Sequence, residues 1–128
     1  MPARPRPTPA ELEILRVLWE RGPSTVREIH SILSRGRPTG YTTVLKFLQI
    51  MMEKKLVDRD ARQRTHVYRA RASREHTQQQ LLRELTTRAY GGSAAKLVMQ
   101  ALSSKRASAD ELAAIRKLLD ELEEEDHE

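Results

Sequence analysis

The order of segments in the first half of the chain constrains the fold more than any other feature. Apolar residues recur at helical spacing over residues 9–21, 24–33 and 41–54. Two short β-prone stretches follow, at residues 56–57 and 65–70, and a polar, mostly basic turn separates them. Three helices followed by a two-stranded hairpin, in this order, predict a winged helix-turn-helix.

Local signals mark where the predicted helices begin. Thr8 and Glu11 stand three residues apart, as do Thr25 and Glu28. Each pair has the spacing of a capping box, in which a hydroxyl and a carboxylate satisfy free backbone N–H groups at a helix start. In the second hairpin strand we expect Val67 to point inward between charged neighbours.

The apolar pattern beyond residue 72 is helical throughout. We expect three short amphipathic helices, which begin after Ser73, at Ser93 and at Ser108, with a Gly-Gly pair ending the first. Three such helices in about 55 residues cannot close a core of their own, so a second copy of the chain is expected to cover their apolar faces. The expected dimer interface consists of Leu81, Leu82, Leu85, Tyr90, Leu97, Val98, Leu102, Leu112, Ile115, Leu118, Leu119 and Leu122.

Charge is distributed unevenly along the chain. Residues 1–72 hold 15 Lys and Arg against 7 Asp and Glu, a net +8, whereas residues 73–128 hold 8 against 11, a net −3. Only the first half can neutralise phosphate. The first turn of the third helix is small and rich in hydroxyl groups, which suits a helix that enters the major groove, and the hairpin turn is basic. Double-stranded DNA is therefore the expected partner.

These observations predict a mainly α chain of the α+β class. We expect a disordered basic arm at residues 1–7 and a winged helix-turn-helix DNA-binding domain at residues 8–72. An α-helical dimerisation domain at residues 73–124 and a solvated acidic tail at residues 125–128 complete the expected organisation.

Several motifs resemble the penicillinase repressor family, to which the methicillin-resistance repressor and a copper-responsive branch belong. The motifs are TPAELEILRVLW at 8–19, YTTV at 41–44, EKKLV at 53–57, HVY at 66–68 and YGGS at 90–93. The resemblance covers nearly the whole chain, from residue 8 to about residue 122. It implies homodimeric winged-helix repressors that bind inverted repeats of TACA/TGTA type in promoters.

The candidate DNA-binding residues fall on three predicted elements. The resemblance implies base reading at the start of the third helix, where Thr methyl and hydroxyl groups and a Lys can reach base edges. The start of the second helix and the wing offer groups for phosphate or the minor groove. Tyr41 either stacks on the DNA backbone or fills the gap between helices, and Gln49 either reaches the groove or is solvated. The candidates are Ser24, Thr25, Arg27, Tyr41, Thr42, Thr43, Lys46, Gln49, Arg62, Arg64 and His66.

The resemblance also implies a route of induction. Family repressors of β-lactam resistance genes are inactivated when a membrane sensor pathway leads to their cleavage in the helix after the Gly-Gly break. The cleaved bond joins Asn and Phe in the family pattern, and the matching positions here are Gln100 and Ala101. Because the chain departs from the pattern at both positions, cleavage by a protease of such a pathway stays open.

Other chemistries find little support in the sequence. The absence of Cys excludes disulfides and the thiolate cluster of the copper-responsive branch, and the four His show no ligand spacing with carboxylates. We expect no enzyme activity, no cofactor, no metal and no membrane span, and we expect a cytoplasmic protein. Two alternatives remain: a winged-helix module that binds proteins, and a nonspecific architectural or RNA-binding protein.

Overall fold

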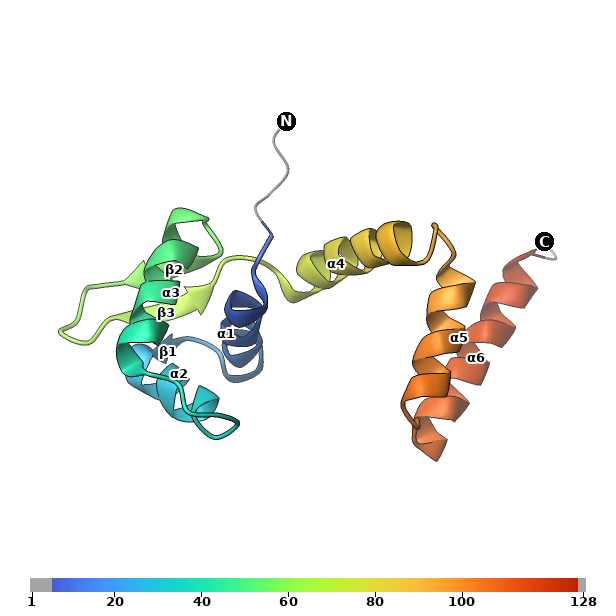
Figure 1. Ribbon diagram of the computed structural model, residues 1–128, viewed down its shortest axis with the longest axis horizontal. Coiled ribbons are helices and arrows are strands. Elements are labelled where there is room, and N and C mark those ends of the chain that lie inside the picture. Colours follow the sequence, from blue (N-terminus) through green and yellow to red (C-terminus); the bar gives the residue numbers. More distant parts are fainter. Residues whose placement is uncertain (1–5, 127–128) are drawn as a thin grey trace. The chain divides into compact units, whose positions relative to one another are not determined.

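The computed structural model describes residues 6–126, in which six helices and three strands form two compact units that divide after Gln80 (Figure 1). Most of the expected basic arm and the last two residues of the expected tail lie outside the described residues; Glu125 and Asp126 complete the last helix. The elements are α1 (Pro9–Arg21), β1 (Ser24–Thr25), α2 (Val26–Leu33), α3 (Tyr41–Glu53), β2 (Val57–Asp60), β3 (Val67–Ala70), α4 (Arg74–Ala89), α5 (Ala94–Ser104) and α6 (Ala109–Asp126).

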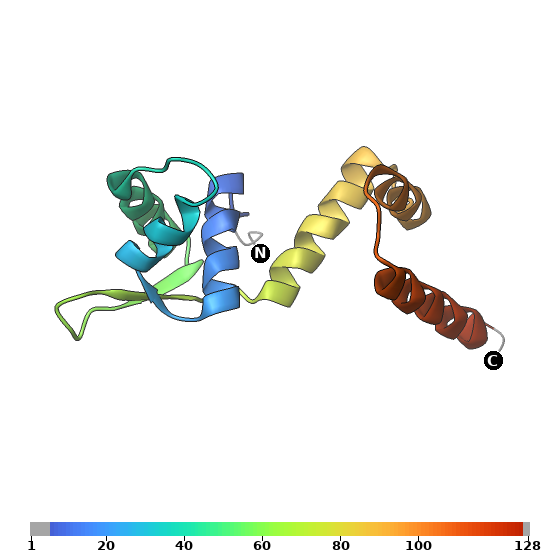
Figure 2. The same cartoon turned by 90° about the horizontal axis from the view of Figure 1, so that it is seen from below.

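The first unit is a winged helix, as predicted. Its sheet has the order β1-β3-β2, with both pairs antiparallel, and the loop between β2 and β3 projects from the unit as the wing (Figures 1 and 2). The sequence did not predict β1, because two residues that open a helix carry no strand pattern of their own. Their pairing partner, β3, lies more than forty residues further along the chain.

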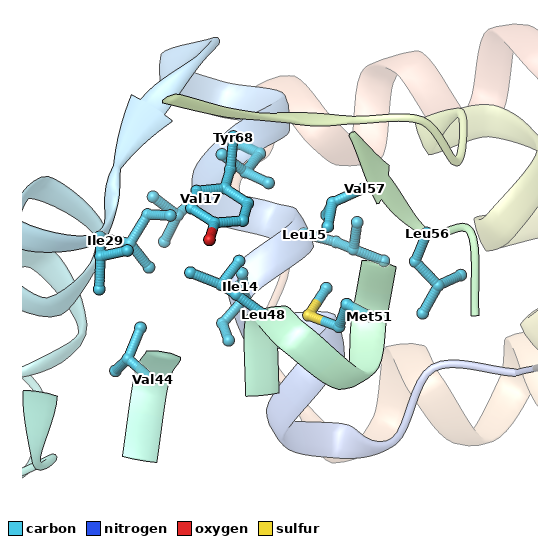
Figure 3. Packing of buried hydrophobic residues seen from close by; sticks show 12 residues of the cluster. Ile14, Leu15, Val17, Ile29, Val44, Leu48, Met51, Leu56, Val57 and Tyr68 are labelled. Carbon is cyan, nitrogen blue, oxygen red and sulfur yellow. The ribbon is translucent and has the colours of Figure 1, made fainter. Parts of the chain in front are cut away.

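The predicted orientation of β3 is wrong. Tyr68, not Val67, points inward: Tyr68 is buried and Val67 only half-buried. Pairing with the neighbouring strands decides this, since Tyr68 lies opposite Ser24 and Ala70 lies opposite Val57, and both of these partners face the core. Figure 3 shows Tyr68 among the buried aliphatic side chains.

Both predicted capping boxes are present: Thr8 Oγ1 accepts from the N–H of Glu11 at 3.3 Å, and Thr25 Oγ1 accepts from the N–H of Glu28 at 3.2 Å.

One hydrophobic core holds the three helices and the sheet of the first unit together. The core consists of Ile14, Leu15, Val17, Leu18, Val26, Ile29, Val44, Leu48, Met51, Leu56, Val57 and Tyr68 (Figure 3).

The first turns of α4 belong to the first unit. The indole Nε1 of Trp19 donates to the carbonyl of Ala72 at 2.9 Å, just before the helix, and Thr77 within the helix is buried. The two compact units divide after Gln80, so the division lies inside α4, eight residues beyond the boundary expected from composition. The start of α4 is therefore packed with the winged helix.

The second unit leaves its apolar side chains largely uncovered. Neither α5 nor α6 contains a buried residue. Of the expected interface residues, Leu81, Tyr90, Leu97 and Ile115 are half-buried. The others are 37–53 % exposed in this single chain: Leu82, Leu85, Val98, Leu102, Leu112, Leu118, Leu119 and Leu122. These helices thus have apolar surface without an interior to bury it.

Candidate nucleic-acid interface

The two faces of α3 differ in burial, as the sequence pattern predicts. Val44, Leu48 and Met51 are fully buried and fix the inner face of the helix in the core. The polar side chains of the outer face are exposed over about two turns: Thr42, Thr43, Lys46 and Gln49. A helix anchored in this way can present hydroxyl groups and an amine to the edges of bases in a major groove.

An open hollow of about 530 Å³ lies beside this helix and brings together three separate parts of the chain. The start of α2, the start of α3 and the wing all contribute to its wall. Three of its residues carry basic groups, and a concave basic surface concentrates anions such as phosphate. The lining residues are Thr25, Val26, Arg27, Tyr41, Leu45, Arg64, Thr65, His66 and Tyr68. Thr25 and Arg27 from α2 therefore meet Arg64 and His66 from the wing at one site, whereas Arg62 lies outside the hollow.

Ser24 does not belong to this site, and its prediction as a phosphate contact is wrong. Its side chain is fully buried, and its Oγ donates to the carbonyl of Gly22 at 2.9 Å. The residue pairs with Tyr68 in the sheet, which turns the side chain away from solvent. The sequence suggested a helix start, but the strand that precedes the helix places this hydroxyl in the interior.

The first turn of α2 carries one cation, Arg27, and one carboxylate, Glu28. The backbone N–H of Thr25 donates to Glu28 at 3.0 Å and holds the pKa of that carboxyl below its ordinary value, with help from the Thr25 hydroxyl and from Arg21. Glu28 is therefore ionised at neutral pH, and its charge is paired with the guanidinium of Arg21. The exposed side chain of Arg27 supplies the positive charge here.

The two wing arginines have different surroundings. The guanidinium of Arg62 binds the carboxylate of Asp60, with Nε 3.0 Å from Oδ1 and Nη2 2.8 Å from Oδ2. The hydrogen bonds from the Arg62 side chain lower the pKa of Asp60 well below 3.8, and Asp60 raises the pKa of Arg62 in turn. Arg64 lines the hollow, and its guanidinium has no ion pair within residues 6–126. The wing thus presents Arg64 as its uncompensated cation.

Tyr41 lies between α2 and α3, and its stacking on the DNA backbone stays a prediction. Its side chain is 49 % exposed at the wall of the hollow, and its ring also contacts the imidazole of His30, with centroids 5.7 Å apart. His30 was not among the predicted site residues, because a lone His on an amphipathic helix carries no local signal of such a contact. Leu45 and Thr65 also line the hollow without having been predicted.

The comparisons agree with this architecture. A protein-family model described as penicillinase repressor matches residues 7–121. The chain belongs to the penicillinase repressor family. It is 32 % identical over 114 residues to the transcriptional regulator BlaI of two Mycobacterium tuberculosis strains, which covers 88 % of this chain and 82 % of the relative. The solution structure of the DNA binding domain of the repressor BlaI matches with a TM-score of 0.51 and 23 % identity, over 58 % of this chain and 90 % of that one.

Family membership establishes the general activity. The family consists of transcriptional repressors and not of enzymes, so the chain is a transcriptional repressor with a winged-helix DNA-binding domain. No helix within residues 6–126 is long and apolar enough to cross a membrane. The same range contains no group of three or more His, Asp or Glu placed to hold a metal ion.

Proposed function

We propose that this repressor acts as a homodimer and reads an inverted-repeat operator with the first turns of α3. The observation that carries the proposal is the exposed face of Thr42, Thr43 and Lys46 beside a hollow that contains Arg27 and Arg64. Side chains that can distinguish bases lie next to cations that can hold phosphate, and specific DNA binding needs both kinds of contact.

The uncovered apolar surface of α5 and α6 supports a dimer. Apolar side chains such as Leu118 and Leu119 are about half exposed in the single chain, and burial against a second copy would remove them from water. Two-fold symmetry then requires two half-sites about one helical turn, roughly 10 base pairs, apart. Tethering makes the second half-site contact intramolecular, which raises operator affinity above that of one winged helix.

The regulated genes and the route of induction form a second part of the proposal. The family's description points to penicillinase genes, hence to β-lactam resistance, as the regulated class. Gln100 and Ala101 are exposed in α5, so a protease that unwinds this helix would reach the bond between them. Cutting there would detach α6 and part of α5, and we propose that the loss of dimer surface releases the operator.

Competition binding tests the main proposal. Fluorescence anisotropy of the full-length chain on a labelled TACA/TGTA-type inverted repeat is challenged with unlabelled repeat and with scrambled duplex of equal length. We expect the repeat to compete at least about 1,000-fold better, the lower end of the usual specificity range. Equal competition would show nonspecific architectural binding, and no binding to either duplex would favour the protein-interaction alternative.

A further inference from the structure

The helix α3 begins without a side-chain cap. Its N-cap residue is Gly40, which has no side-chain oxygen for the first backbone N–H groups, whereas the side chains of Thr8, Thr25 and Ser93 supply one to α1, α2 and α5. Uncapped first turns fray readily. Thr42 and Thr43 lie in this turn, so contacts from outside the helix contribute to fixing their position.

The residue before Gly40 is held by α2. Nε2 of His30 lies 2.7 Å from the carbonyl oxygen of Thr39, and Oγ of Ser34 donates to the same oxygen at 3.4 Å. Since a carbonyl oxygen can only accept, Nε2 of His30 carries the proton and donates it. Of the two bonds, the one from His30 is short and the one from Ser34 is long, so His30 provides most of the restraint.

The same imidazole contacts the residue that opens α3. The rings of His30 and Tyr41 meet edge to face, with an interplanar angle of 73°. His30 is itself half-buried, and the neighbouring Ile29 is fully buried in the core, so the imidazole projects from a fixed helix. One side chain therefore bonds the residue before the first turn of α3 and packs on the residue that begins it.

We infer that His30 is a positioning residue for base reading: it holds the first turn of α3 where Thr42 and Thr43 meet the operator. The inference rests on the function proposed above. Base contacts demand a geometry held within about 0.5 Å, and a shift of the first turn disrupts them. Phosphate contacts made by long, flexible cations such as Arg27 tolerate such a shift. Loss of His30 should thus reduce discrimination between DNA sequences more than it reduces binding to DNA in general.

Three variants of the full-length chain separate the effect of the hydrogen bond to Thr39 from that of the ring contact with Tyr41. His30→Leu removes both, His30→Phe keeps a ring but not the donor, and His30→Gln keeps an N–H donor. We expect His30→Leu and His30→Phe to weaken binding to the inverted repeat by about tenfold or more. Binding to scrambled duplex at the same salt should change by less than about twofold. His30→Gln should recover most of the operator affinity, and His76→Leu, on the exposed first turn of α4, is the control and should match the parent.

Amide hydrogen exchange without DNA provides an independent measurement. The N–H of Val44, which bonds the carbonyl of Gly40 at 3.1 Å, should exchange faster in His30→Leu and His30→Phe, while the buried turn around Leu48 should stay protected. Unchanged discrimination in both variants, or equal losses on both duplexes, would overturn the positioning role. If the parent itself failed to prefer the repeat, the proposed function would fail; unchanged exchange at Val44 would then overturn the inference on its own.

Discussion

The amine of Lys54, which follows the last residue of α3, lies 2.8 Å from the buried carboxylate of Glu11 in the first turn of α1. The same Oε1 atom accepts the backbone N–H of Thr8 at 2.8 Å, so one carboxylate both caps α1 and binds the end of α3. The side chain of Glu11 is only 2 % exposed, and water screens this pair far less than a surface pair. The pair thus connects two helices that are distant in sequence.

Removing the charge of Glu11 should destabilise the first unit. Glu11→Gln keeps an acceptor for the cap but leaves the amine of Lys54 without its counter-charge, and we expect a loss of about 1–3 kcal/mol in the free energy of unfolding. Glu13→Gln is the matched control, because Glu13 forms an exposed pair with Arg37 at 3.3 Å and should cost less than about 1 kcal/mol. Urea unfolding of both variants measures the difference, and equal effects would contradict the structural role assigned to Glu11.

Side chains on the outer face of α3 should determine operator affinity. Thr43→Ala and Lys46→Ala should each lower affinity for the inverted repeat by about 1–3 kcal/mol, with smaller effects on scrambled duplex, because base contacts carry the discrimination. Arg16→Ala is the control: its side chain lines a different hollow, between α1 and α2. Anisotropy titrations at one fixed salt concentration give the comparison. A Thr43→Ala variant that bound the repeat as tightly as the parent would exclude α3 as the base-reading element.

The two wing arginines should differ in their contribution to phosphate binding. Arg64→Ala should reduce the slope of log affinity against log salt by about one unit per protomer. Arg62→Ala should change the slope less, since Asp60 already compensates its charge. Asp60→Asn should release Arg62 and raise affinity for scrambled duplex. Similar slopes for the Arg62 and Arg64 variants would show that DNA breaks the pair with Asp60.

The pair of Asp60 and Arg62 also predicts a pH dependence. The pKa of Asp60 is lowered below its ordinary 3.8. The stability that the pair gives to the fold is therefore fully present above pH 3.8, and it is lost only as the pH falls through the lowered pKa. Between pH 5 and 8 the wing pair should therefore stay intact. Titration of the Asp60 carboxyl by NMR checks this, and an apparent pKa near 3.8 or above would show that the pair does not form in solution.

A charge placed on α6 should separate dimerisation from folding of the winged helix. In Leu118→Glu or Leu119→Glu, burial of an unpaired carboxylate in the proposed interface would be costly, so the protein should sediment as a monomer and bind the operator weakly. The melting of the first unit should not change. Substitution of Glu124, a polar neighbour on the same helix, by Gln is the control. An undiminished operator affinity in a demonstrated monomer would refute the coupling between dimerisation and binding.

Features encoded in a few consecutive residues could be predicted from the sequence, and features that depend on distant partners could not. The capping box of Thr8 and Glu11 lies within four residues, and its helix begins where predicted. The inward orientation of Tyr68 depends on its pairing with Ser24, 44 residues away, and the burial of the Ser24 hydroxyl follows from that same pairing. At the site, exposure of the α3 face followed from helical periodicity. The hydrogen bond from His30 to the carbonyl of Thr39 depends instead on how the loop between α2 and α3 folds back.

The division of the chain inside α4 has a consequence for how such repressors can diverge. A gene fusion that exchanged DNA-binding domains at residue 72 would separate the winged helix from Thr77, a buried residue of its own unit. An exchange at Gly91 and Gly92 would carry the whole of α4 with the winged helix, and it would fall where both residues have positive φ, of 58° and 86°, outside any helix. Recombinants joined at this glycine pair should keep the winged helix whole but separate residues 81–90 from the second unit, so a junction on either side of the division inside α4 disrupts one of the two units and ties operator reading to the module that follows it.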